Sequence, residues 1–268
     1  MGSTTDTPAL ATNPKFIFFT DFDGTITTAD SNDHLTDNYG FGVEKRRVQN
    51  EEVLFERMHF RDSFRDMMDS IKTPLDQCIE ILKKSIRLDP GFKDFYDWAQ
   101  ENNVPIVILS GGMQPVIRAL LDTLLGPNWN IQVVSNDVGP REGKTVNEEG
   151  GWQILFHDES IHGHDKSIEI RKYSGLPNRP TMFYAGDGVS DLSAAKETDL
   201  LFAKADKGEQ SVSPYGSRVA NDVLDLVVYC EKEKVPFVTF RDWTTITQTC
   251  KDIAAGKVTV QEAAKGRI

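Results

Sequence analysis

The sequence predicts an α/β fold in which helices cover both faces of a parallel sheet. Short apolar runs of the kind that form buried strands alternate with segments of helical periodicity. The apolar runs are residues 15–20, 105–109, 131–134, 181–185 and 200–203. The helical segments are residues 113–125, 165–173, 190–196 and 223–232. Because the two kinds alternate, we expect a Rossmann-like parallel sheet, with any ligand beyond the carboxyl ends of its strands.

Residues 30–89 break this alternation, because they show helical periodicity and no clear strand. Within them, Thr73 and Pro74 are typical of an N-cap and a first helical residue, and they predict a helix over residues 75–86. An all-helical insert after the first strand would form a cap over the site. We therefore predict a core domain of residues 15–29 and 90–268 and a helical cap domain of residues 30–89.

The chain carries no obvious targeting signal. Its first fourteen residues, MGSTTDTPALATNP, are small and polar and lack the basic start and apolar block of a secretory signal, so we expect residues 1–14 to be disordered. No run of 18 apolar residues predicts a membrane span. The three cysteines, Cys78, Cys230 and Cys250, are far apart and suit a reducing compartment, so we expect a cytoplasmic protein.

The composition is acidic, with 41 Asp and Glu against 30 Lys and Arg and a formal net charge of -11. Such a surface repels nucleic acid and anionic membranes, so neither is expected as a partner. It also repels phosphorylated metabolites, so a phosphate site would need positive charge from a metal ion or a lysine. Monomer and homodimer are both compatible with the sequence.

Two acidic motifs follow predicted strands. Asp21 and Asp23, in DFDGT, come directly after the first apolar run, where one carboxylate can attack phosphorus and the other can handle the leaving-group proton. Asp187 and Asp191, in GDGVSD, come after the fourth run and can form with Asp21 an oxygen site for a hard cation, for which Mg²⁺ fits. A helix N-cap would explain Asp191 alone, but not two acidic strand ends in one chain.

Two further segments are candidates for binding phosphate. Ser110 and Gly111, in SGG, follow the second apolar run and precede a helix, where a hydroxyl and free backbone N–H groups can hold phosphoryl oxygens. Lys166 stands at a predicted helix start, which is unfavourable for a cation unless an anion lies nearby. Lys144 is the competing lysine, and we prefer Lys166 because its helix leads directly into the fourth strand.

Taken together, DFDGT, SGG, a lysine and GDGVSD occur in an order and spacing that resemble the haloacid dehalogenase (HAD) superfamily. The helical insert resembles that of its phosphoserine-phosphatase-like branch, which includes methylthiopentenyl-phosphate phosphatases and fungal polyol- or sugar-phosphate phosphatases. The resemblance implies an Mg²⁺-dependent phosphoric monoester hydrolase that acts on a small phosphorylated metabolite through an aspartyl-phosphate intermediate.

The resemblance also implies a role for each motif residue. Asp21 would be the nucleophile and a metal ligand. Asp23 would be the acid and base and would lend its backbone carbonyl to the metal. Lys166 would neutralise charge on the phosphate, beside the oxygens bound by Ser110 and Gly111. Asp187 would bind Mg²⁺ directly, and Asp191 would hold the water shell of the ion.

The sequence defines the identity of the substrate less clearly than it defines the type of reaction. Asp30 falls where this branch places an acidic cap residue facing substrate, although a plain helix N-cap is an equal alternative. Phosphoserine phosphatases hold the substrate carboxylate with a cap arginine, and here Met67 falls at that position, with Arg61 and Arg65 nearby. This favours a polyol or sugar phosphate. An isoprenoid or lipid diphosphate, a phosphoamino acid and a non-catalytic phosphate-binding scaffold are the alternatives.

A cluster of histidines and a cluster of aromatic residues are both expected to have structural roles. His157, His162 and His164 precede Lys166, and they lack a convincing fourth ligand for zinc. We expect them to lie at the surface or to pack behind the site residues, and pocket lining by His162 or His164 is the alternative. Trp243, with Phe237 and Phe240, is expected to anchor a last strand and helix to the sheet rather than to bind substrate.

Overall fold

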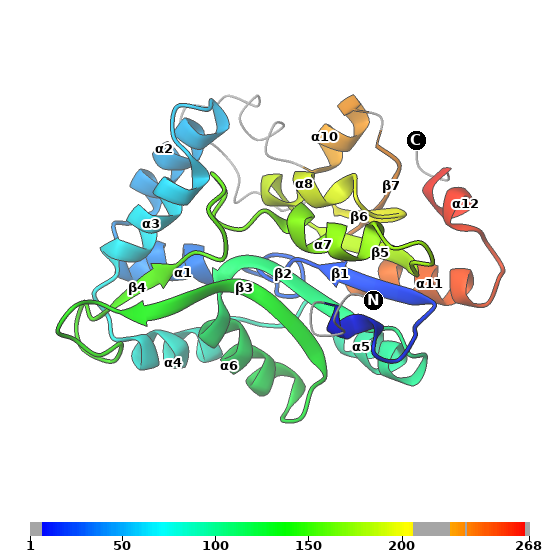
Figure 1. Cartoon of the computed structure of the whole chain (residues 1–268). Helices are drawn as coiled ribbons and strands as arrows, with labels where there is room; N and C mark the ends of the chain where they lie inside the picture. Colours follow the sequence, from blue (N-terminus) through cyan, green and yellow to red (C-terminus); the bar gives the residue numbers. More distant parts are fainter. Residues whose placement is uncertain (1–6, 206–225, 234, 266–268) are drawn as a thin grey trace.

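The predicted α/β fold is confirmed by the computed structural model, which describes residues 7–205, 226–233 and 235–265. A seven-stranded sheet has the order β4-β3-β2-β1-β5-β6-β7 (Figure 1). All neighbouring strands are parallel except β3 and β4, which are antiparallel. The strands are β1 (Phe16–Thr20), β2 (Ile106–Met113), β3 (Ile131–Pro140), β4 (Trp152–Leu155), β5 (Thr181–Gly186), β6 (Leu200–Lys204) and β7 (Phe237–Phe240).

Apolar side chains alternate between two cores, one on each face of the sheet. On β1, Phe18 belongs to one buried cluster, and Ile17 and Phe19 belong to the other. Figure 1 shows α7, α8 and α10 on the face of Ile17 and Phe19, and α4, α5, α6 and α11 on the opposite face. Burial on both faces is the reason why these strands are continuously apolar in sequence. These helices are α4 (Leu75–Ser85), α5 (Phe92–Glu101), α6 (Gln114–Leu125), α7 (Lys166–Ser174), α8 (Leu192–Ala195), α10 (Leu226–Glu233) and α11 (Trp243–Ala254).

Helices α1 to α5 lie between β1 and β2, as the helical insert predicted. The first three, α1 (Ser31–Tyr39), α2 (Val43–Leu54) and α3 (Phe60–Ser70), gather at one end of the sheet (Figure 1). The two linkers of the insert pair with each other through an antiparallel bridge between Thr27 and Leu88. The insert is thus joined to the core by two adjacent linkers. Its helix α4, which the sequence places in the cap of residues 30–89, packs beside α6 on one face of the sheet, so the extent of the cap domain stays a prediction.

Three local expectations differ from the structure. Residues 7–14 are not a disordered leader, because Pro8–Leu10 form a 3₁₀ helix and Ala9 is buried in the core; residues 1–6 lie outside the described part. Helix α4 begins at Leu75, with Pro74 rather than Thr73 at the N-cap. Strand β3 continues to Pro140, beyond the apolar run, because its far half pairs with β4.

The C-terminal aromatics are structural, as expected. Trp243 is fully buried, and its ring lies 5.5 Å from that of Phe18 and 4.7 Å from that of Phe92. Phe237 and Phe240 are also buried, on β7. Helix α12 (Val260–Lys265) follows α11 at the end of the described chain.

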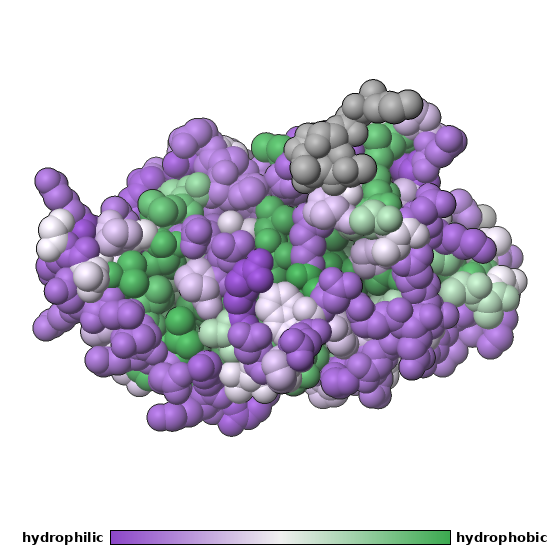
Figure 2. Space-filling model, turned by 60° about the horizontal axis from the view of Figure 1, so that its bottom comes forward, coloured by the Kyte–Doolittle hydropathy of each residue, from purple (hydrophilic) through white to green (hydrophobic). Residues whose placement is uncertain are grey.

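Hydrophilic side chains cover most of the face shown in Figure 2, with apolar residues visible between them. Within residues 7–205, 226–233 and 235–265, no helix is both long enough and apolar enough to cross a bilayer.

Candidate active site

The acidic motifs meet at the carboxyl ends of β1 and β5. Asp21 follows β1, and its backbone N–H donates to Ala185 O at 2.9 Å, which joins it to β5. Gly24 has a φ of 74°, and a Cβ at that position would lie only 2.5 Å from Asp187 Oδ2. The loop after β1 therefore touches the loop after β5, and the close approach requires a glycine.

Asp21, Asp187 and Asp191 form a cluster that could hold a metal ion. Each offers one carboxylate oxygen, and these oxygens all lie within 4.8 Å of one another. A set made only of carboxylate oxygens matches a hard cation such as Mg²⁺, which binds few carboxylates and takes its other ligands from water and phosphate. The backbone oxygen of Asp23 remains a predicted ligand.

Lys166 lies inside this cluster. Its Nζ is 2.9 Å from Asp21 Oδ2 and 2.7 Å from Asp191 Oδ1, and its side chain is buried. Burial alone would lower the pKa of Lys166, but Asp191 and Asp21 outweigh it and raise that pKa. Lys144, the competing lysine, is exposed and donates to Glu149 O at 2.8 Å in the β3–β4 connection. The geometry therefore supports Lys166 as the lysine next to the acidic cluster.

Asp191 also has a structural role, in addition to its position in the acidic cluster. Its Oδ2 accepts from the backbone N–H groups of Asp187 and Gly188 at 2.9 and 3.0 Å, and its Oδ1 accepts from the hydroxyl of Tyr184. Burial alone would raise the pKa of Asp191, but Lys166 outweighs it and holds that pKa below its ordinary value. Asp191 therefore stays ionised and fixes the turn that presents Asp187.

Asp23 is held by the first turn of the cap. Its Oδ1 accepts from Ser31 N at 2.8 Å and its Oδ2 from Asn32 Nδ2 at 3.0 Å. Burial, followed by the charge of Asp30, raises the pKa of Asp23 well above its ordinary value. A raised pKa favours the protonated form of this acid, which can donate its proton to a leaving group.

Asp30 is the N-cap of α1, as one of its two readings predicted. Its Oδ1 accepts from the backbone N–H groups of Asn32 and Asp33 at 2.7 and 2.9 Å. This N-cap fixes the backbone of Asn32, whose side chain donates to Asp23. Asp30 therefore acts on the site indirectly, through the first turn of α1. Its proposed contact with substrate stays a prediction.

Ser110 and Gly111 lie beside Asp23. The sequence predicts them after the strand, but β2 continues to Met113, and its register is irregular between Ser110 and Met113, where the backbone turns toward Asp23. A Cβ added to Gly112 would lie 2.9 Å from Asp23 Oδ2 and 3.2 Å from Ser110 Oγ. Ser110 Oγ accepts from Gly112 N at 3.0 Å, so its own hydrogen can be donated to a phosphoryl oxygen. Asn136 donates to Gly111 O at 2.7 Å and so fixes the orientation of the next peptide unit.

The histidines fall into three different environments. His164 is buried, burial lowers its pKa to about 4, and its Nδ1 lies 3.0 Å from Ser110 O. His157 Nε2 lies 3.1 Å from Glu169 Oε1, and His162 is exposed. In the described part of the chain no metal-binding group includes them. His164 therefore packs behind the site residues, where its ring contacts the backbone of Ser110.

Three contacts of the site were not predicted from the sequence. Asn32 binds Asp23, Tyr184 binds Asp191 from within an apolar strand, and His164 binds the backbone of Ser110. Only Tyr184 carried a hint, because its hydroxyl stands in a run predicted to be buried, where a polar group needs a partner.

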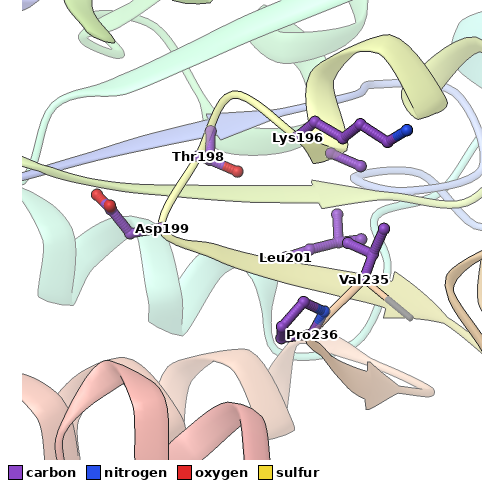
Figure 3. A pocket seen from close by; sticks show the side chains of 7 residues that line it. Lys196, Thr198, Asp199, Leu201, Val235 and Pro236 are labelled. Carbon is purple, nitrogen blue, oxygen red and sulfur yellow. The ribbon is translucent and has the colours of Figure 1, made fainter. Parts of the chain in front are cut away.

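A pocket of about 330 Å³ lies elsewhere, and Figure 3 shows the side chains that line it. Asp199 and Pro236 stand just before β6 and β7, at the amino ends of these strands. The catalytic candidates follow the carboxyl ends of β1 and β5, at the opposite edge of the sheet. This pocket is therefore separate from the acidic cluster.

We expect Lys166→Met to reduce the free energy of unfolding by about 3 kcal/mol, because it leaves buried carboxylates without their cation. Urea unfolding at pH 7 in a chelator measures this change. Lys93→Met is the control, since Lys93 pairs with Asp97 at 2.5 Å on the exposed side of α5 and should change the free energy by less than about 1 kcal/mol. Equal small changes in the two variants would contradict a buried ionic centre.

Comparisons with known proteins agree with this geometry. The family of haloacid dehalogenase-like hydrolases matches residues 18–196, which contain every acidic residue of the cluster. The chain is 46% identical to "Polyol phosphate phosphatase PYP1" of Saccharomyces cerevisiae over 92% of this chain and 98% of that protein. It is 45% identical to "Pdp3-interacting factor 1" of Schizosaccharomyces pombe, over 88% of this chain and 95% of that protein.

More distant matches show the same fold. A "2-hydroxy-3-keto-5-methylthiopentenyl-1-phosphate phosphatase" of Bacillus cereus is 29% identical over 85% of this chain and 93% of that protein. A solved structure described as "Phospho-Aspartyl Intermediate Analogue of Phosphoserine phosphatase" superposes with a TM-score of 0.60 and 18% identity, over 88% of this chain and 98% of that chain. The chain therefore belongs to the haloacid dehalogenase-like hydrolase family, as a homologue of its phosphatases.

Proposed function

We propose that this chain is an Mg²⁺-dependent phosphomonoesterase that hydrolyses a small polyol or sugar phosphate through an aspartyl-phosphate on Asp21. The observation that carries the proposal is the position of Lys166 Nζ, 2.9 Å from Asp21 Oδ2, inside a carboxylate cluster that fits a divalent cation. One oxygen of Asp21 is thus next to positive charge, where a phosphate group can be both attracted and attacked.

The first chemical step would transfer the phosphoryl group to Asp21. A carboxylate oxygen of Asp21 attacks phosphorus while the bond from phosphorus to the substrate oxygen breaks. Asp23 gives its proton to that oxygen, so the product leaves as an alcohol. Ser110 Oγ–H and the N–H groups of the following turn would donate to the phosphoryl oxygens, and Lys166 would neutralise the remaining charge.

The second step would release phosphate. Asp23, now ionised, takes a proton from a water molecule, which attacks phosphorus and breaks the bond to Asp21. Inorganic phosphate leaves, and both aspartates return to their starting states. Asp21 and Asp187, with Asp191 supporting them, would hold Mg²⁺, which supplies charge neutralisation for the phosphoryl oxygens when it is bound.

The cap arginines support a substrate without a carboxylate. The guanidinium of Arg61 donates to Asp158 O at 2.7 Å and lies over the ring of Phe156. Arg65 binds Asp62 at 3.0 Å. Met67 is buried in the hydrophobic core. Because these groups are engaged in structural contacts, the arrangement favours a neutral polyhydroxylated phosphate over a phosphoamino acid.

The cap residue Phe60, next to Gly111, also limits the size of the substrate. A Cβ added to Gly111 would lie 3.9 Å from Phe60 Cε1, so the cap covers this turn with an aromatic ring. This cover favours a small substrate over a lipid or isoprenoid diphosphate.

A panel of phosphate esters tests the proposed substrate class. We expect kcat/KM with Mg²⁺ to be at least about tenfold higher for polyol and sugar phosphates than for phosphoserine or isoprenoid phosphates, because an uncompensated carboxylate or a long chain would be left without a partner. A higher kcat/KM for phosphoserine would overturn the assignment. Absence of hydrolysis for every ester would favour the non-catalytic scaffold.

A further inference from the structure

The loop that follows Asp23 is held by groups from distant parts of the chain. Three consecutive backbone carbonyls of this loop each accept one hydrogen bond from such a group. The pairs are Gly24 O with Lys204 Nζ at 2.7 Å, Thr25 O with Trp243 Nε1 at 2.8 Å, and Ile26 O with Asp89 N at 2.8 Å.

The three donors form one connected network. Lys204 Nζ lies 2.5 Å from Asp89 Oδ2, and the two side chains are only 12% and 4% exposed. Asp89 Oδ1 accepts from the backbone N–H of Trp243 at 3.2 Å. Since every member is buried and paired, the network resists displacement of any one of its groups.

This network acts on the part of the site where small movements matter most. Gly24 directly follows Asp23, and it is packed so closely against Asp187 that a Cβ would lie 2.5 Å from Asp187 Oδ2. A shift of the Gly24 peptide would therefore move Asp23 relative to the acidic cluster. Misplacement of a catalytic group by about 1 Å can cost about 10²-fold in rate.

We propose that Lys204 and Trp243 are positioning residues, which hold the Gly24–Thr25 peptides so that Asp23 can protonate the leaving oxygen. Both residues lie beyond residues 18–196, the part matched by the family. Neither contacts the acidic cluster directly, and both act through the backbone of the loop. The inference rests on the proposed phosphatase function.

The dependence of the rate on the leaving group distinguishes positioning from general damage. An alkoxide is strongly basic and needs a proton as it leaves, whereas p-nitrophenolate is weakly basic and leaves without one. A misplaced Asp23 should therefore slow glycerol phosphate much more than p-nitrophenyl phosphate. A variant with fewer folded molecules would lose the same factor with both esters.

The experiment compares kcat/KM of Lys204→Met and Trp243→Phe with these two esters, because kcat/KM reports the steps up to release of the alcohol. We expect each variant to lose about tenfold with glycerol phosphate and less than about threefold with p-nitrophenyl phosphate. Trp243→Phe removes the indole donor but keeps an aromatic ring in the core. If Lys204→Met does not fold, Trp243→Phe still tests the positioning role, because lost packing alone would slow both esters equally.

Two matched variants serve as controls. Trp129→Phe removes an indole N–H that binds Asp122 at 2.7 Å on the surface, and Lys257→Met removes an exposed pair with Asp252 at 3.0 Å. Both should match the wild type with both esters. Equal losses with the two esters, or no loss in Trp243→Phe, would overturn the positioning role. A wild-type protein that hydrolyses neither ester would instead defeat the phosphatase proposal on which it rests.

Discussion

Asp21→Asn should reduce kcat by at least about 10³-fold with every phosphate ester, because the amide cannot form the aspartyl-phosphate. The measurement is release of inorganic phosphate by purified protein in Mg²⁺. Labelled substrate should also leave phosphate bound to quenched wild-type protein and none on the variant. Asp94→Asn, on the exposed side of α5, is the control and should keep normal activity. Activity of Asp21→Asn close to that of the wild type would remove Asp21 from the nucleophile role.

The same substitution should not unfold the chain. Burial raises the pKa of Asp21 to about 8, although Lys166 opposes this shift. The unfolded chain ionises this carboxyl near its ordinary pKa of about 4. The carboxyl therefore favours folding most below about pH 4, and its contribution is lost as pH rises toward 8. In a chelator, Asp21→Asn should have a higher Tm than the wild type at pH 8, and the difference should shrink toward pH 4. A constant difference across this range would contradict the raised pKa.

Removal of divalent cations should reduce activity at least about 10²-fold, and added Mg²⁺ should restore it. Without the cation, Lys166 is the positive charge among the acidic groups of Asp21, Asp187 and Asp191, so the cluster has no excess positive charge with which to attract a phosphate dianion. Activity after dialysis against a chelator, before and after Mg²⁺, measures the effect. Full activity in the chelator would contradict the metal-dependent mechanism.

Binding of Mg²⁺ should also be visible in stability. Because the ion binds the folded cluster and relieves repulsion among its carboxylates, Tm should rise with Mg²⁺ concentration in the wild type. Asp187→Asn removes one ligand charge and should need more Mg²⁺ for the same rise, whereas Asp94→Asn should follow the wild-type curve. Identical curves for Asp187→Asn and the wild type would exclude Asp187 as a ligand.

The sequence by itself determined the sheet and the meeting of the acidic motifs. Asp21 and Asp187 each follow an apolar run, and the carboxyl ends of parallel strands lie at one edge of a sheet. Such local patterns predict where the motifs lie, because a buried strand, its end and a glycine turn each depend on residues that are close together in the sequence. The helical insert was determined in the same way, by its periodicity.

Only the tertiary structure decided which polar groups support the site. Lys204, Asp89 and Trp243 are far apart in sequence, yet they bind one loop. His164 reaches the backbone of Ser110, and Arg61 donates to Asp158 O from a distant part of the chain. Periodicity predicts which face of an element is buried, but a hydrogen bond between distant elements depends on how they pack. For that reason the sequence could predict candidates for the reacting residues, but not the residues that hold them in place.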